Sequence, residues 1–167
     1  LAPLVMRATF GVKKGYPDLI VLDSTDPDAL RSVEKRINPS KTLFIVSSKS
    51  GTTIEPLSFF EYFYANVKVL LGEGAGENFI AITDAGSALE GFYRKYSMRR
   101  LFTNPSDIGG RYSALSYFGL VPAALCGIDV GRLLYFASRA SLSMQPGVRA
   151  VENRGLMLSA LAKAASV

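Results

Sequence analysis

The chain has 167 residues, 49% of them hydrophobic, which suits one globular domain with a sizeable core. Its 19 Lys and Arg against 14 Asp and Glu give a formal charge of +5, which favours anionic ligands. The basic residues lie in scattered pairs with no long basic run, so we expect no nucleic-acid partner. There is no His, and any reaction must therefore use carboxylates, Lys, Tyr or groups from outside the chain.

Apolar residues come in short runs, none of which approaches the roughly 20 residues that a bilayer-spanning helix needs. No signal-peptide pattern is visible at the N-terminus. The single Cys, Cys126, lies in an apolar stretch, which is typical of a buried structural thiol in a reducing compartment. We expect a cytoplasmic protein without membrane contact.

Strand and helix signals alternate through the first hundred residues, because short apolar runs bounded by turn formers precede stretches of helical periodicity. Such alternation predicts a parallel sheet covered by helices on both faces. The expected strands are 18–23, 42–47 and 78–83, and the expected helices are 26–37, 54–71 and 88–96.

After a short extended piece at 101–103, the pattern turns helical near 113–126, 132–144 and 150–165. Loops are expected at 72–76 and 145–147. We therefore predict a three-layer α/β/α sandwich with a parallel sheet and a helical C-terminal third, in one domain over 1–167.

The segment Ser48-Lys-Ser-Gly-Thr-Thr53 lies where a predicted buried strand ends and a helix begins. Free backbone amides and the positive end of the helix face one point there, which favours an anion. Gly51 allows close backbone approach, and four hydroxyls suit the oxygens of a phosphate monoester. The alternative is an ordinary Ser/Thr helix cap with Glu55 in the first turn. The spacing of a Walker A loop is absent.

Two motifs carry a resemblance to a known family. Ser47-Ser-Lys-Ser-Gly-Thr-Thr-Ile-Glu-Pro56 resembles the phosphate loop of sugar isomerase (SIS) domains, in the form found in glucose-6-phosphate isomerases. Asp107-Ile-Gly-Gly-Arg-Tyr-Ser-Ala-Leu-Ser116, followed by Gly119-Leu-Val-Pro122, is similar to the second signature of those isomerases. The resemblance covers essentially the whole chain and implies a flavodoxin-like SIS domain truncated at both ends relative to the full enzyme.

The resemblance also implies roles for individual residues of the first motif. Ser48, Lys49, Ser50 and Thr53 would hold the substrate phosphate, Lys49 mainly through its backbone, with Gly51 in support. Thr52 would bind phosphate or cap the following helix.

In the second motif, the resemblance places Arg111 near the C1 and C2 oxygens of the sugar, where a fixed cation stabilises an enediolate. The two preceding glycines, Gly110 among them, let the guanidinium approach a ligand. For Asp107 we favour a structural role. Glu55 is rejected as the base, because its carboxylate would repel a phosphate dianion beside it.

The function implied is interconversion of glucose 6-phosphate and fructose 6-phosphate through a cis-enediol, without metal or other cofactor, in a homodimer. The Glu base and the ring-opening His and Lys of the family have no matching motif in this chain, so the isolated fragment is expected to be inactive. The chain looks most similar to bacterial fusions of transaldolase with phosphoglucose isomerase.

The alternative is a non-catalytic SIS module that senses sugar phosphates in a regulator. A dinucleotide site at Gly72–Gly76 is disfavoured, because these glycines precede a strand.

Overall fold

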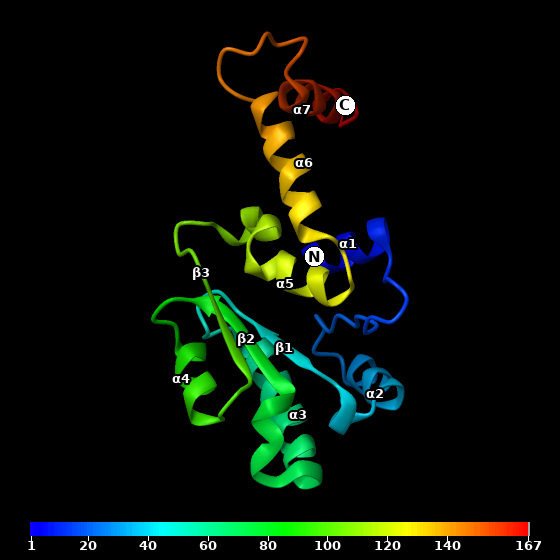
Figure 1. The fold of residues 1–167 in the computed structure, drawn as a ribbon, viewed down its shortest axis with the longest axis vertical. Helices are drawn as coiled ribbons and strands as arrows, with labels where there is room; N and C mark the ends of the chain where they lie inside the picture. The colour runs from blue at the N-terminus through cyan, green and yellow to red at the C-terminus, as the bar shows by residue number, and fades with distance from the viewer. Residues whose placement is uncertain (167) are drawn as a thin grey trace. The chain divides into compact units, whose positions relative to one another are not determined.

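The computed structural model describes residues 1–166 (Figure 1). It contains two compact units: Leu1–Ile128 carries the sheet and the candidate site, and a second, helical unit begins at Asp129. The expectation of one domain over 1–167 stays a prediction.

The sheet has three parallel strands, β1 (Phe44–Ser47), β2 (Phe79–Asp84) and β3 (Arg100–Asn104), in the order β1-β2-β3. The central strand β2 is buried from Phe79 to Thr83, as expected for a strand covered on both faces. The expected strands at 42–47 and 78–83 are therefore confirmed, and the extended piece at 101–103 forms the third.

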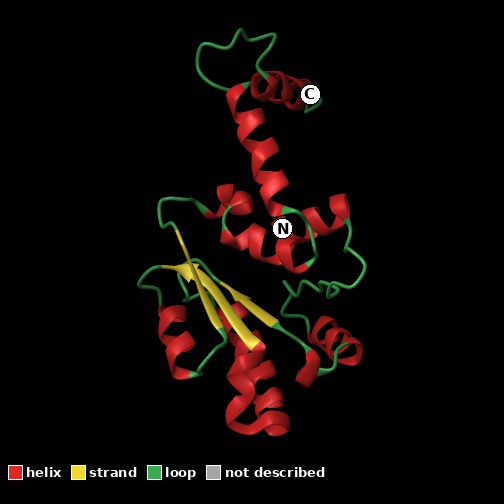
Figure 2. Ribbon diagram, in the orientation of Figure 1, coloured by secondary structure: helices red, strands yellow, loops and turns green. Residues whose placement is uncertain are grey.

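Helices cover both faces of this sheet (Figure 2), which confirms the α/β/α layering. α3 (Ile54–Leu71) contacts β1, and α4 (Ala88–Lys95) contacts β2 and β3. On the other face, α5 (Tyr117–Leu125) contacts β2 and β3, and α1 (Ala2–Phe10) packs on α5. The remaining elements of this unit are α2 (Pro27–Arg36) and the 3-10 helices η1 (Pro39–Lys41), η2 (Gly72–Asn78) and η3 (Gly110–Leu115).

Aromatic side chains form the core between α3 and the sheet. Phe60 is 2% exposed, and its ring lies 5.4 Å from that of Phe79 and 4.9 Å from that of Tyr96. Phe44 and Phe79 stack at 4.8 Å across the two paired strands. Phe60 and Phe63 of α3 are therefore core residues, whereas Tyr62 is 39% exposed and its hydroxyl donates to Glu34 Oε1 at 2.6 Å. Cys126 is buried as expected.

The expected strand at 18–23 is wrong, because this segment forms no strand. The backbone amides of residues 20–23 make no backbone hydrogen bond within the described residues, and β1 pairs with β2 alone. A cavity of about 860 Å³, lined by Leu19–Leu22 and by Phe44–Ser47 among others, is bounded by this segment and by β1. Apolar composition makes a segment suitable for a strand, but a strand forms only where a neighbour supplies the ladder of hydrogen bonds. The helix α1 was likewise not expected from the sequence.

The second unit contains α6 (Val130–Leu142) and α7 (Arg154–Ala164), which confirms the helical C-terminal third. Each begins at a side-chain cap: Asp129 accepts a hydrogen bond from the amide of Arg132, and Asn153 accepts from those of Gly155 and Leu156. No helix in the described part of the chain is long and apolar enough to cross a bilayer.

Candidate functional site

The loop Ser48–Thr53 connects β1 to α3, and Thr53 is the N-cap residue of that helix. The Thr53 side chain accepts no hydrogen bond from the first turn, and the N-termini of α1 and α5 also lack a side-chain cap, whereas α2, α4, α6 and α7 have one. Thr52 is not the cap residue. The first amides of an 18-residue helix therefore have no capping side chain, and the positive end of the helix is available to an anion.

The four hydroxyls of this loop divide into one internal group and three outer groups. Ser48 is buried, and its Oγ accepts from the Gly51 amide at 3.1 Å and donates to Thr53 Oγ1 at 3.3 Å. Ser50, Thr52 and Thr53 are exposed, with Ser50 Oγ 2.9 Å from Thr52 Oγ1. The Ser48 hydroxyl therefore shapes the turn, and the other three are open to a ligand.

Gly51 has a φ of 70°, and a Cβ atom there would lie 2.4 Å from the backbone nitrogen of Leu89 in α4. From the sequence, this glycine was expected to allow close approach of a ligand. The structure gives a different requirement, because the turn packs directly against the first residues of α4.

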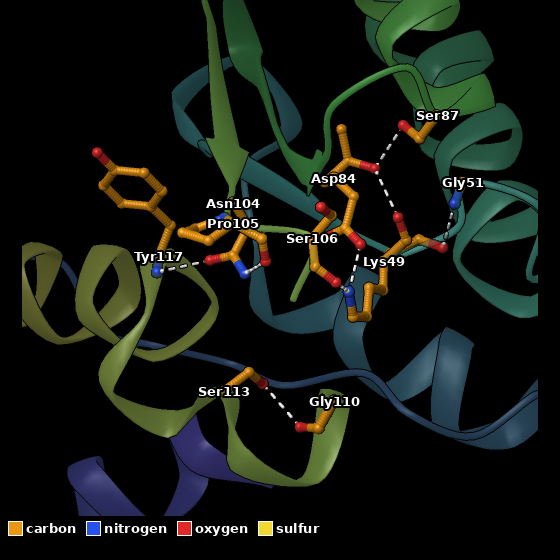
Figure 3. A network of polar contacts seen from close by, with 12 residues as sticks. Lys49, Gly51, Asp84, Ser87, Asn104, Pro105, Ser106, Gly110, Ser113 and Tyr117 are labelled. Atoms are coloured by element: carbon orange, nitrogen blue, oxygen red, sulfur yellow. Dashed lines mark hydrogen bonds and ion pairs between the residues drawn. The ribbon is translucent and has the colours of Figure 1, made fainter. Parts of the chain in front are cut away.

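Lys49 points its side chain towards the ends of the two other strands (Figure 3). Its ammonium group forms an ion pair with Asp84, the last residue of β2, and donates a hydrogen bond to the Ser106 carbonyl at 3.0 Å. Its own carbonyl accepts from the Asp84 amide and from Thr83 Oγ1, both at 3.2 Å. Lys49 thus joins the loops that follow all three strands.

Asp84 is a site residue for which the sequence indicated no role. Its side chain is 16% exposed, and its Oδ1 atom is buried without a hydrogen-bond partner among the described residues. The available signal was its position at the carboxyl end of a predicted parallel strand, where loops from neighbouring strands meet.

Asn104, also missed, fixes the end of β3 (Figure 3). It is 2% exposed, its Oδ1 accepts from the Tyr117 amide at 3.2 Å, and its Nδ2 donates to the Pro105 carbonyl at 3.1 Å. These bonds anchor the start of the segment 105–109 to the first residue of α5.

Arg111 lies in η3, directly after that segment, and is exposed. Its guanidinium forms no ion pair with any described residue. A Cβ atom on Gly110 would meet nothing within 4 Å, so the space beside the arginine backbone is open. The turn is fixed by Ser113 Oγ, which donates to the Gly110 carbonyl at 2.7 Å. The guanidinium is therefore available to an anionic ligand.

The two acidic residues weighed from the sequence are both exposed. Glu55 lies in the first turn of α3, where its carboxylate complements the helix dipole, and Asp107 lies between β3 and η3. Within the described residues, no group of three or more His, Cys, Asp or Glu is arranged to hold a metal ion. The β1–α3 loop offers hydroxyls and free amides at the carboxyl end of a parallel sheet, where ligands bind in such folds, and Arg111 adds an exposed cation on the segment that follows β3.

Known proteins match this chain in sequence and in structure. The family model of phosphoglucose isomerase matches residues 1–139. A glucose-6-phosphate isomerase of Thermus thermophilus is 35% identical over 84% of the chain and 34% of its own length. One from Prochlorococcus marinus is 34% identical over 97% of the chain and 31% of its own length.

Two solved structures are similar. A hypothetical protein of Thermus thermophilus superposes with a TM-score of 0.83 and 30% identity, over 96% of this chain and 38% of that one. A glucose-6-phosphate isomerase of Chlamydia trachomatis gives a TM-score of 0.63 and 32% identity, over 75% of this chain and 24% of that one. The chain thus spans about a third of the length of these curated relatives. It belongs to the phosphoglucose isomerase family.

Proposed function

We propose that this chain is the phosphosugar-binding part of an isomerase that interconverts glucose 6-phosphate and fructose 6-phosphate through a cis-enediol. The observation that carries the proposal is the uncapped N-terminus of α3, which begins at a hydroxyl-rich turn. Helices α1 and α5 also lack a side-chain cap, so what distinguishes α3 is the set of three exposed hydroxyls, those of Ser50, Thr52 and Thr53, beside its first turn.

In this proposal the substrate phosphate binds at the β1–α3 loop. The exposed hydroxyls of Ser50, Thr52 and Thr53 donate to its oxygens together with the first amides of α3. Ser48 holds the turn in shape, and Lys49 contributes through its backbone, since its ammonium group is held by Asp84.

Arg111 acts at the other end of the sugar in the proposed reaction. Moving a proton between C1 and C2 develops negative charge on the neighbouring oxygens, and a fixed guanidinium stabilises that charge. The arginine motif favours an isomerase over a non-catalytic phosphosugar sensor, because a sensor needs no cation at an enediolate. The base and the ring-opening groups are proposed to lie in the remainder of a longer enzyme.

The proposal also covers the ligand, the cellular compartment, the oligomeric state and a fused domain. Curated relatives named as glucose-6-phosphate isomerases support a sugar phosphate as the ligand. The single buried Cys126 supports a reducing compartment such as the cytoplasm. A homodimeric enzyme, and its fusion to a transaldolase, are proposed from the sequence resemblance alone.

The test is calorimetric titration of fructose 6-phosphate into the wild-type chain and into a Ser50→Ala/Thr53→Ala variant. Two hydrogen bonds to a charged group are removed, each contributing roughly 1.5–3 kcal/mol, so the affinity should fall by about 10²-fold or more. A Thr25→Ala/Ser58→Ala variant makes the same chemical changes at exposed positions outside the loop and should bind as wild type. Equal affinity in the loop variant and the wild type would refute the phosphate site.

A further inference from the structure

The ammonium group of Lys49 is the one cation inside the proposed phosphate loop, yet the structure turns it towards Asp84 and Ser106 (Figure 3). The side chains of Lys49 and Asp84 are 31% and 16% exposed, so this ion pair is partly shielded from water. A shielded pair is screened less by solvent and salt than the exposed pairs on the rest of this surface. The ion pair therefore connects the β1–α3 loop to the end of β2.

A third loop is joined by a hydrogen bond from the same ammonium group to a backbone carbonyl. The Lys49 ammonium donates to the Ser106 carbonyl at 3.0 Å, and Ser106 belongs to the segment that leads into Arg111. That segment is short and turned, with the Ile108 amide bonded to the Pro105 carbonyl and the Tyr112 amide to the Gly109 carbonyl. Ser106 is thus connected to the arginine by about five residues of turned backbone.

Asp84 holds this arrangement in place. Its amide and its carboxylate both bind Lys49, one at the carbonyl and one at the ammonium group. The Lys49 ammonium binds Oδ2, and Oδ1 has no hydrogen-bond partner among the described residues, so Lys49 provides the main stabilisation of this carboxylate. Without that carboxylate, the Lys49 ammonium group loses the negative partner charge that keeps it between the loops.

We propose that Asp84 is a positioning residue, which acts through Lys49 and the Ser106 carbonyl to couple the occupancy of the phosphate loop to the position of Arg111. Phosphate bound at Ser50 and Thr53 fixes the backbone of Lys49, and the bridge formed by Lys49, Asp84 and Ser106 passes this constraint to the arginine segment. The coupling rests on the proposed function, because it requires phosphate at the β1–α3 loop. The coupling adds that phosphate binding at the β1–α3 loop positions the Arg111 guanidinium for the C1–C2 end of the sugar.

The test is a titration of inorganic phosphate into the ¹⁵N-labelled chain, followed through the amide signals of Gly51 and Gly110. In the wild type both signals should shift with the same midpoint. In Asp84→Asn, which keeps the shape and the backbone bond, the Gly51 signal should still shift and the Gly110 signal should lose its response. Asp84→Glu restores a carboxylate and should recover the Gly110 response, which a merely structural role of Asp84 does not predict. Asp28→Asn removes an exposed ion pair of 3.0 Å to Arg31 and serves as the matched control.

The outcomes separate the two proposals. If the wild-type Gly51 signal does not shift, the phosphate site is refuted and the coupling fails with it. If Gly51 shifts while Gly110 stays still in the wild type, or if Gly110 still responds in Asp84→Asn, only the coupling is overturned. Should Asp84→Asn fail to fold, the wild-type comparison of the two midpoints still decides, because different midpoints contradict coupling.

Discussion

At residue 51 the backbone and its surroundings both require glycine, and this requirement can be measured. The φ of 70° disfavours any L side chain, and a Cβ atom would lie 2.4 Å from the Leu89 backbone nitrogen. Gly86 has a similar φ of 73°, but a Cβ atom there would meet nothing within 4 Å. A comparison of substitutions at Gly51 and Gly86 therefore separates the cost of backbone strain from the cost of steric overlap.

We predict that Gly51→Ala lowers the free energy of unfolding by about 1–3 kcal/mol more than Gly86→Ala, because only the first adds a clash between packed backbones. Urea denaturation of the two variants and the wild type measures the difference. Equal losses in both variants would mean that the turn does not pack on α4 as described.

Arg111 allows a prediction about the reaction itself. In a full-length enzyme containing this chain, Arg111→Ala should lower kcat by roughly 10²–10³, the scale for loss of one electrostatic stabiliser of a transition state. KM should change less, because the charge that the guanidinium stabilises develops only during proton transfer. Steady-state kinetics with fructose 6-phosphate provide the measurement, and a variant altered only in KM would show that the arginine merely binds substrate.

Among single residues, the sequence predicted the position of the loop between a strand and a helix, but not the direction of the Lys49 side chain. The hydroxyls and the glycine lie next to one another in the sequence, so their local pattern was visible. The partners Asp84 and Ser106 are 35 and 57 residues away from Lys49, and only the pairing of three strands brings them to it.

At the scale of elements, most helices could be predicted, but helix α1 and the absence of a strand at 18–23 could not. The helix over 54–71 agrees with α3 at both ends, because its apolar periodicity and its flanking Thr53 and Gly72 are local signals. The segment 18–23 has the composition of a strand, but its backbone has no hydrogen-bonded neighbour in the described chain. Strand formation depends on a partner that composition does not reveal.

The buried and exposed faces of α3 should contribute very differently to the free energy of unfolding. Phe60→Ala should lower the free energy of unfolding by about 3–5 kcal/mol, because it removes a ring that is 2% exposed and packed on Phe79. Val69→Ala, on the same helix at 86% exposure, should change it by less than about 0.5 kcal/mol. Thermal or urea unfolding of both variants tests this, and a small effect at Phe60 would contradict the described core.

At the scale of the whole molecule, we expect this chain to bind the substrate phosphate without catalysing the isomerisation. The chain spans about a third of its curated relatives, and its candidate site contains groups that bind an anion or stabilise charge. No residue of the loop or of the arginine segment is assigned to proton abstraction. The unit Leu1–Ile128 should therefore hold the phosphate end of a substrate without converting it.

The phosphate site is tested by a calorimetric comparison of fructose 6-phosphate with fructose on the purified 167-residue chain, with an isomerase assay on the same sample. We predict measurable binding of the phosphate ester, no binding of the free sugar at the same concentration, and no turnover. Failure to bind fructose 6-phosphate, or equal binding of fructose, would contradict the phosphate site, and substantial turnover would show that the proton-transferring base lies within these residues.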